Sequence, residues 1–230
     1  MNKTLGIITV SYLRPNVLRL WCASINRIRE QLDMFIPAVV VSDESDKRIC
    51  NNYHIAHITQ QNKPVTEKFN RAMGYMRNIG QTNVMILGSD DIVSTDFVRK
   101  TLVEVEKGID LIYVETFYFF CGQGLDRGKL VRLTNKQIKG IGKTVSSRVL
   151  DQCDWRPWNR ERSWGMDAIA NKVFLQFANS KSVVEDMIVD VKTRDNLNSF
   201  RIWSKRLPQE DPQRFYDILS DEELKILKAL

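Results

Sequence analysis

Two adjacent carboxylates, Asp90 and Asp91, follow the apolar run 84–87 after the pair Gly88-Ser89. Four consecutive apolar residues that end in turn residues are typical of a buried strand. Two like charges at the end of such a strand repel each other, so they need water, a cation or hydrogen-bond donors nearby. Mg²⁺ and Mn²⁺ are commonly held by one or two carboxylates, with the other positions left to water and phosphates. The pair therefore predicts a divalent metal site.

A helix start would explain the same stretch without a metal. Ser94 or Thr95 could cap a helix that runs through Lys107, and Asp96 would then lie in the first turn, where the helix dipole favours negative charge. This alternative accounts for Asp96 better than for the adjacent pair before it.

A second stretch, residues 154–167, reads DWRPWNRERSWGMD and combines tryptophans with arginines. Such side chains bind sugars and nucleotides by stacking and by forked hydrogen bonds. Asp167 lies in the first turn of a helix that we expect to run to Phe177. It could simply favour the helix dipole, or it could project into a cleft as a general base.

The elements that position these residues are predicted by hydrophobic patterning. Continuous apolar runs at residues 5–10 and 36–41 each end in polar residues, and an amphipathic helix begins at Pro15 between them. A helix at 65–79 precedes the strand at 84–87. Apolar strands that alternate with helices predict an α/β domain with a mostly parallel sheet covered on both faces.

The polar ends of these strands should converge on one edge of the sheet. Thr9 to Ser11, Asp43 and the acidic pair follow the strands, and the amino end of the 65–79 helix is nearby to receive an anion. Ligands of such sheets bind beyond the carboxyl ends of the strands. Convergence therefore marks these residues as candidates, although each one alone could be a turn or a cap.

Later segments predict a strand at 111–116, extended by the aromatic run 117–120, which could be core or the floor of a cleft. Residues 115–121 and 129–133 should form a hairpin across the glycine-rich turn 122–128, and a last strand should follow at 182–189. Gly140 to Thr144 is not a phosphate-binding P-loop, because Gln137 stands where the first glycine is needed. We expect one main domain over residues 1–207 and a helical extension over 208–230, because a capping box at Ser220 marks the start of a helix there.

Composition indicates an ordinary globular protein of 230 residues with a net charge of +6. The four cysteines are dispersed, which favours a reducing cytosol. The short apolar run near the N-terminus lacks a cleavage site, and no later run could span a bilayer. We therefore expect a cytoplasmic protein with no membrane partner. Its charge favours an anionic partner, although a solvated basic surface would give the same value.

The order of these elements resembles the GT-A class of nucleotide-sugar glycosyltransferases, particularly its family-two-like members, over roughly residues 5–198. The resemblance implies a Rossmann-like GT-A fold with flanking helices, followed here by the C-terminal helical tail. It implies a nucleoside-diphosphate sugar as donor, with a UDP-sugar favoured, and a divalent metal, Mn²⁺ or Mg²⁺. It points to Thr9, Ser11 and Asp43 for the base of the nucleotide. With the charge that Arg14 and Lys68 could add for the diphosphate, the residues we expect at the donor are Thr9, Ser11, Arg14, Asp43, Lys68, Asn70, Ser89 and Asp91.

The acidic motif of that family is usually written DxD, and this chain departs from it. Gly88 stands in place of the first aspartate, so its contact is lost or passes to Ser89 or Asp91, whereas Asp90 matches the metal-binding aspartate. We expect Asp90 and Asp91 to hold the metal. The stretch 164–167 resembles the element that carries the base of inverting members, which implies that Asp167 deprotonates the acceptor hydroxyl.

Two other classes of function remain open from the residues alone. The same sheet edge would suit a metal-dependent nucleotidyltransferase or hydrolase, and it would suit a catalytically silent module that binds sugar nucleotides or nucleic acid. For a glycosyltransferase, the acceptor is a saccharide or DNA carrying a hydroxymethylated pyrimidine, as in phage DNA-modifying glucosyltransferases. The DNA hypothesis depends on the interleaved residues Trp155, Arg156, Trp158, Arg160, Arg162 and Trp164.

Overall fold

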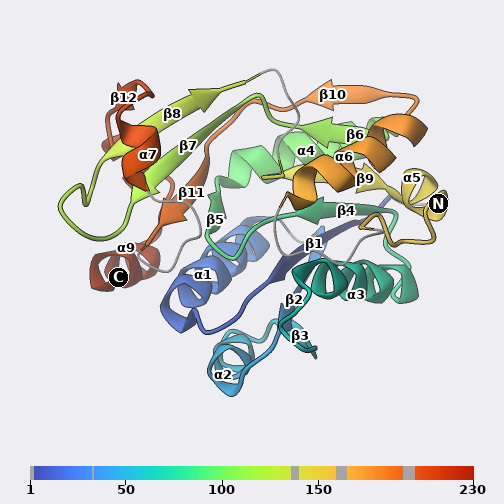
Figure 1. Cartoon of the computed structure of the whole chain (residues 1–230), viewed down its shortest axis with the longest axis horizontal. Helices are drawn as coiled ribbons and strands as arrows, with labels where there is room; N and C mark the ends of the chain where they lie inside the picture. The colour runs from blue at the N-terminus through green and yellow to red at the C-terminus, as the bar shows by residue number, and fades with distance from the viewer. Residues whose placement is uncertain (1–2, 33, 136–139, 159–164, 194–199) are drawn as a thin grey trace.

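Strands and helices alternate through the first half of the chain in the computed structural model, which describes residues 3–32, 34–135, 140–158, 165–193 and 200–230 (Figure 1). The elements of this half are β1 (Leu5–Val10), α1 (Pro15–Gln31), β2 (Phe35–Val41), α2 (Glu44–Asn52), β3 (Ala56–Thr59), α3 (Val65–Asn78), β4 (Asn83–Ile86), β5 (Asp91–Val93) and α4 (Thr95–Lys107). These elements confirm the predicted alternation, because β1, β2 and β4 are largely apolar, buried runs and each longer helix buries one apolar face.

The second half contains shorter elements and more strands. They are β6 (Leu111–Tyr113), β7 (Thr116–Cys121), β8 (Leu130–Thr134), β9 (Lys143–Ser146), α5 (Ser147–Asp151), α6 (Met166–Phe177), β10 (Lys181–Val183), β11 (Ile188–Lys192), α7 (Phe200–Ser204), β12 (Gln209–Glu210), α8 (Gln213–Tyr216) and α9 (Asp221–Ala229).

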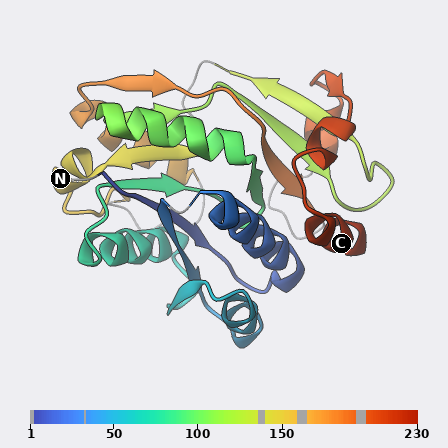
Figure 2. The same ribbon diagram turned by 180° about the vertical axis from the view of Figure 1, so that it is seen from behind.

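A seven-stranded sheet in the order β10-β6-β9-β4-β1-β2-β3 forms the centre of the fold. Its β1 pairs in parallel with β2 and β4, and only β9 runs antiparallel to its neighbours among the described strands. Buried side chains of α1, α2 and α4 pack on one face, and those of α3, α5 and α6 pack on the other. Helix α6 is in front of the sheet in Figure 1, and α4 is in front in Figure 2. The predicted mostly parallel α/β sheet with flanking helices is confirmed.

A second sheet of five strands, in the order β12-β8-β7-β11-β5, was not predicted. The predicted hairpin is confirmed as β7 and β8 of this sheet. Strand β5 belongs to it, whereas β4 belongs to the central sheet. The turn between β4 and β5 therefore carries Gly88, Ser89 and Asp90 from one sheet to the other.

The prediction of one last strand at 182–189 is wrong, because the chain changes sheets there. Strand β10 joins the central sheet and β11 joins the second one. Two acids between them are held by hydrogen bonds: Ser94 Oγ donates to Asp186 Oδ1 at 2.7 Å, and the backbone N–H of Glu115 donates to Glu185 Oε1 at 3.1 Å. The predicted strand at 111–116 divides between β6 and β7 in the same way.

Residues 208–230 pack against the rest of the fold. Strand β12 pairs with β8, and α9 lies on α1. Arg27 Nε donates to Glu223 Oε2 at 2.8 Å, and the Glu223 side chain is fully buried. Among the residues that the structure describes, no helix has the length and apolar character needed to cross a bilayer.

The capping box of α9 provides a test of this packing. Ser220 Oγ accepts from the Glu223 N–H, and the Glu223 carboxylate accepts from the Ser220 N–H at 2.8 Å. Replacing Ser220 by alanine leaves a helix N–H without its acceptor, so we expect the free energy of unfolding to fall by about 1 kcal/mol. Urea denaturation measures this, with the exposed Lys225→Ala of the same helix as control, expected within about 0.5 kcal/mol of the parent. A loss for Ser220→Ala no larger than that of the control would contradict the assigned cap.

Candidate active site

The turn between β4 and β5 folds the two acidic side chains back over Gly88. The Gly88 N–H donates to an Asp91 carboxylate oxygen, and the Asp91 N–H donates to the Gly88 carbonyl at 3.1 Å. A Cβ atom at Gly88 would lie 2.7 Å from Asp90 Oδ1 and 3.0 Å from Asp91 Oδ2. Glycine therefore stands at this position because the neighbouring carboxylates fill the space that a side chain would need.

A third carboxylate, that of Asp190, joins the pair from β11. Strand β11 runs antiparallel to β5 with Asp190 opposite Asp91. One carboxylate oxygen from each of Asp90, Asp91 and Asp190 lies within 4.8 Å of the others. Asp190 was not predicted as a site residue, because the predicted strand ended at Val189. The alternation Val-Asp-Val-Lys at 189–192 was the available signal, since it places Asp190 and Lys192 on one face of a strand.

Burial and mutual repulsion make this cluster electrostatically costly. Burial raises the pKa of Asp91, and the nearby carboxylates of Asp90 and Asp190 raise it further. Burial, followed by the charge of Asp90, raises the pKa of Asp190 to about 7. Both directions are those expected when carboxylates share a site from which water is partly excluded.

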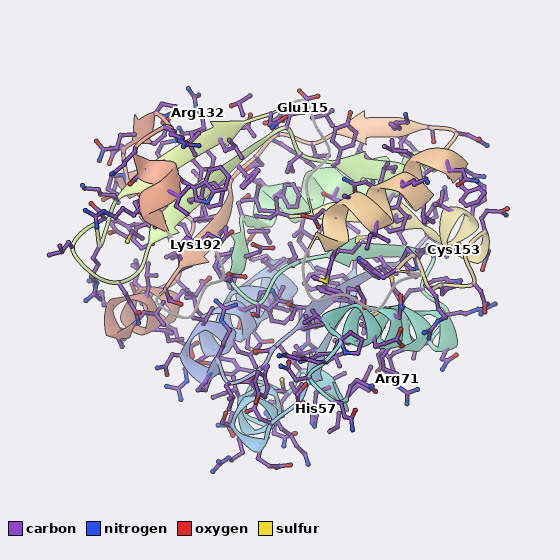
Figure 3. The ribbon with its side chains drawn as sticks, in the orientation of Figure 1. His57, Arg71, Glu115, Arg132, Cys153 and Lys192 are labelled. Carbon is purple, nitrogen blue, oxygen red and sulfur yellow. The ribbon has the colours of Figure 1, made fainter. Side chains whose placement is uncertain are left out.

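Two cations compensate part of the charge. Lys192 Nζ lies 2.5 Å from Asp190 Oδ2, and Arg14 Nη2 lies 3.3 Å from Asp90 Oδ2 (Lys192 is labelled in Figure 3). Asp190 Oδ1 is buried and has no hydrogen-bond partner among the described residues. Three carboxylates with an unsatisfied buried oxygen are a donor set that fits a hard divalent cation such as Mg²⁺ or Mn²⁺.

A cavity of about 680 Å³ opens beside the three carboxylates. It brings together most of the residues that the sequence indicated: Ser11, Arg14, Lys68, Ser89, Asp90, Asp91 and Asp167. The aromatic run contributes through Phe117 and Phe119, which are buried in the core and also line the cavity. These two phenylalanines of the aromatic run therefore belong both to the core and to the wall of the cavity.

The turn after β1 is fixed by two carboxylates of α2. Ser11 Oγ donates to Asp46 Oδ2 at 2.6 Å, and the Leu13 N–H donates to Asp43 Oδ2 at 2.8 Å. Asp43 also caps α2, because the Asp46 N–H donates to its Oδ1 at 2.9 Å. Asp43 thus lies at the predicted edge of the sheet, where it holds the turn that carries Ser11, and it is not among the described residues that line the cavity.

Two further predicted donor residues lie behind the cavity wall. Thr9 is fully buried within β1. The Asn70 side chain exchanges hydrogen bonds with the backbone of Trp158, donating at 3.0 Å and accepting at 3.4 Å. The structure does not place either of them among the described residues that line the cavity.

Lys68 is a buried cation that lines the cavity next to Ser11, where the resemblance implies that the nucleotide binds. Its side chain is 1 % exposed, and Nζ donates to the Ser11 carbonyl at 2.5 Å. Burial lowers the pKa of Lys68 to about 8, against the opposing effect of Asp46 and Asp43. It is therefore charged at neutral pH and able to attract an anion.

The lowered pKa of Lys68 predicts that binding of a nucleoside diphosphate in this cavity depends on pH. Above about pH 8 the lysine loses its proton, so we expect the affinity for UDP with Mg²⁺ to fall progressively. Calorimetric titration on either side of that pH measures the change. In Lys68→Met the affinity should already be low, and the fall above pH 8 should be absent. An equal fall in that variant would assign it to another group, such as Lys143, whose pKa is also lowered to about 8 by burial.

Asp167 reaches the cavity from the first turn of α6, as predicted. Gly165, with φ +62°, precedes the helix. The Asp167 carboxylate occupies the space where a Cβ of Gly140 would lie, so glycine is required there for this position of the acid. Asp167 therefore faces the cavity and also lies where the helix dipole favours it.

The tryptophan and arginine stretch is only partly available for binding. Trp155 and Trp158 are 3 % and 4 % exposed and pack in the core, where Phe69 contacts Trp158 with ring centroids 5.0 Å apart. Arg156 Nη2 lies 2.8 Å from a carboxylate oxygen of Glu67. Burial of its large apolar ring keeps Trp155 away from the cavity, since it is not among the described residues that line it. Trp158 does line the cavity, so stacking of a ligand on Trp158 stays a prediction. Arg160, Arg162 and Trp164 lie outside the described residues.

No protein-family model matches the sequence, and no curated protein matches it. Solved structures do match the fold. A mannosyltransferase from Pyrobaculum calidifontis, in complex with GDP-mannose and Mn²⁺, gives a TM-score of 0.61 at 12 % identity over 100 % of this chain and 74 % of its own. Glucosyl-3-phosphoglycerate synthase from Mycobacterium tuberculosis, in complex with Mn²⁺, UDP and glucosyl-3-phosphoglycerate, gives 0.54 at 10 % identity over 88 % and 75 %.

A third similar structure belongs to another kind of enzyme. The 4-diphosphocytidyl-2C-methyl-D-erythritol synthase from Anaerococcus prevotii gives a TM-score of 0.55 at 12 % identity and covers 99 % of this chain and 95 % of its own. At these identities the matches establish the fold, which is the GT-A-like α/β fold that the resemblance implied. Because fold does not determine activity, function has to be argued from the site.

Proposed function

We propose that this protein is a metal-dependent glycosyltransferase that moves a sugar from a nucleoside-diphosphate sugar to an acceptor hydroxyl. One observation carries the proposal: three clustered carboxylates and a separate acid, Asp167, line one cavity of a GT-A-like fold. The cluster suits a diphosphate-bound cation, and the separate acid suits proton abstraction.

Asp90, Asp91 and Asp190 would hold the cation. A divalent cation bound there supplies Lewis-acid neutralisation of the charge that develops on the leaving diphosphate. Arg14 and Lys68 line the same cavity and add positive charge for the phosphates. The Mn²⁺ complexes of two structural neighbours support this assignment.

Asp167 acts as the base in the proposed reaction. Its carboxylate takes the proton of the acceptor hydroxyl, and the acceptor oxygen forms a bond to the anomeric carbon of the sugar. The bond between that carbon and the diphosphate oxygen breaks, so the nucleoside diphosphate leaves with the electron pair. One displacement of this kind inverts the anomeric configuration.

The donor in this proposal is a UDP-sugar. UDP is present in one structural neighbour, whereas another holds GDP-mannose, so the choice of base is part of the proposal. For the acceptor we propose DNA that carries a hydroxymethylated pyrimidine. The net charge of +6 supports a polyanionic acceptor. A saccharide is the competing acceptor.

A nucleotidyltransferase is the second candidate, because a synthase named for a diphosphocytidyl product shares the fold. Incubation with a panel of nucleotide sugars and Mn²⁺ separates the candidates by their products. A glycosyltransferase releases nucleoside diphosphate slowly even without an acceptor. Release of monophosphate or pyrophosphate would instead favour the second candidate or a hydrolase, and no release from any donor would favour a binding module.

A further inference from the structure

A groove of about 880 Å³ lies beside the active-site cavity, on the second sheet. The turn between β7 and β8, the end of β11, and α7 form its walls. Its charged lining side chains are four cations and one acid: Lys129, Lys192, Arg201, Lys205 and Asp126. Lys129 pairs with Asp126 at 2.6 Å and Lys192 pairs with Asp190 at 2.5 Å, so the excess positive charge of the groove comes from Arg201 and Lys205.

The active-site cavity has the opposite balance. Three cations, Arg14, Lys68 and Lys192, and four acids, Asp90, Asp91, Asp167 and Asp190, line it. In the proposed function the acids hold the metal and the base, and the cations beside them serve the donor diphosphate, so further phosphates of a polyanion would be attracted by the cations of the groove. The charge distribution thus divides the surface into a place for the reacting groups and a place for a polyanion.

The groove and the cavity adjoin each other at β11 and α7. Lys192 lines both, and it lies two residues after Asp190 on β11. Helix α7 separates them: Arg201 and Ser204 line the groove, whereas Trp203 lines the cavity and stacks on Phe119 with ring centroids 5.1 Å apart. A ligand held in the groove would therefore end next to the proposed metal site.

We infer that this groove binds the phosphodiester backbone of an acceptor DNA and presents one of its nucleotides to the cavity. The inference rests on the proposed function, which it deepens by assigning the surface that holds the acceptor. The only aromatic residue that lines the groove among the described residues is Phe200, which is 5 % exposed. The groove thus contacts phosphates without stacking on bases, so binding should be independent of sequence.

The salt dependence of DNA binding tests the inference. Fluorescence anisotropy of a labelled DNA duplex with the full chain should show an affinity that falls linearly with salt on a double logarithmic plot. Each cation that contacts a phosphate contributes about one unit of slope. The pair Arg201→Gln and Lys205→Gln should therefore flatten the slope by about two, and adding Lys129→Gln should flatten it by about one more.

A matched control and a separate assay make the outcome clear. Lys225 is an exposed lysine of α9 that does not line the groove, and Lys225→Gln should leave the slope unchanged. Three results would each overturn the inference. They are wild-type binding without salt dependence, groove variants that bind DNA like the parent, and a wild type that binds heparin but not DNA. Donor turnover by the wild type without acceptor tests the proposed function independently, so the two failures are distinguishable.

Discussion

Replacing Asp90 by asparagine is expected to reduce sugar transfer by at least about a thousandfold. A metal that stabilises the leaving diphosphate contributes several kcal/mol to the transition state, and each 1.36 kcal/mol is about a tenfold change in rate. Asparagine keeps the size of the side chain and removes the charge that attracts the cation and Arg14. The rate of nucleoside diphosphate formation with a saturating donor measures the loss.

Asp96 provides the matched control for this variant. It lies in the first turn of α4, close in sequence to the acidic pair, but its side chain is 63 % exposed and pairs with Arg99. Asp96→Asn should keep nearly full activity. The wild type in excess chelator should behave like Asp90→Asn, and undiminished turnover in chelator would remove the metal from the mechanism.

Asp167→Asn is expected to reduce transfer by about 10²- to 10⁴-fold, which is the usual contribution of a positioned general base. The amide cannot accept the acceptor proton, whereas the proposed contacts of the donor with Lys68 and Arg14 do not depend on Asp167. The loss should therefore fall on kcat, with donor affinity nearly unchanged. Steady-state kinetics and calorimetric binding of the donor measure the two quantities separately.

Gly140→Ala tests the same base by geometry. Its Cβ would overlap the Asp167 carboxylate, so the acid must move and transfer should fall although the carboxylate is still present. Gly74→Ala is the control, since a Cβ there meets no neighbouring atom within 4 Å. Unchanged transfer in both Asp167→Asn and Gly140→Ala would reduce Asp167 to a helix-dipole residue, and a product of retained configuration would contradict the inverting scheme.

Much of the fold was predictable because its signals are local. The apolar runs of β1 and β2, Pro15 at the start of α1, and Ser94 as the cap of α4 are each decided by a few neighbouring residues. The structure confirms these elements close to their predicted limits. Local patterns also placed Ser11 and the acidic pair at the same edge of the sheet.

The second sheet could not be predicted from such patterns. It pairs β11 with β5 and β7, which are distant in the sequence, and no local signal specifies a distant partner. Asp190 was missed for this reason. Alternation could show that it shares a strand face with Lys192, but only the pairing of β11 with β5 brings that face to Asp91.

The sequence also could not show which hydrogen bonds the side chains at the predicted sheet edge make. Asp43 follows β2 as expected, yet whether a carboxylate there binds a ligand or caps a helix depends on where α2 starts. Its bonds to the Leu13 and Asp46 N–H groups are satisfied within the protein. A direct role for Asp43 in holding the donor base stays a prediction.

Binding of Mn²⁺ to the wild type and to Asp190→Asn tests the central claim most directly, because only the folded chain brings Asp190 to the acidic pair. Electron paramagnetic resonance titration should show one Mn²⁺ per chain, bound more tightly when UDP is added. Asp190→Asn should weaken that binding by more than about tenfold, since even changes to residues around metal ligands cost 10- to 100-fold. Asp96→Asn should bind Mn²⁺ like the wild type. No Mn²⁺ binding by the wild type at millimolar metal, or equal binding by Asp190→Asn, would contradict a metal site formed by these three carboxylates.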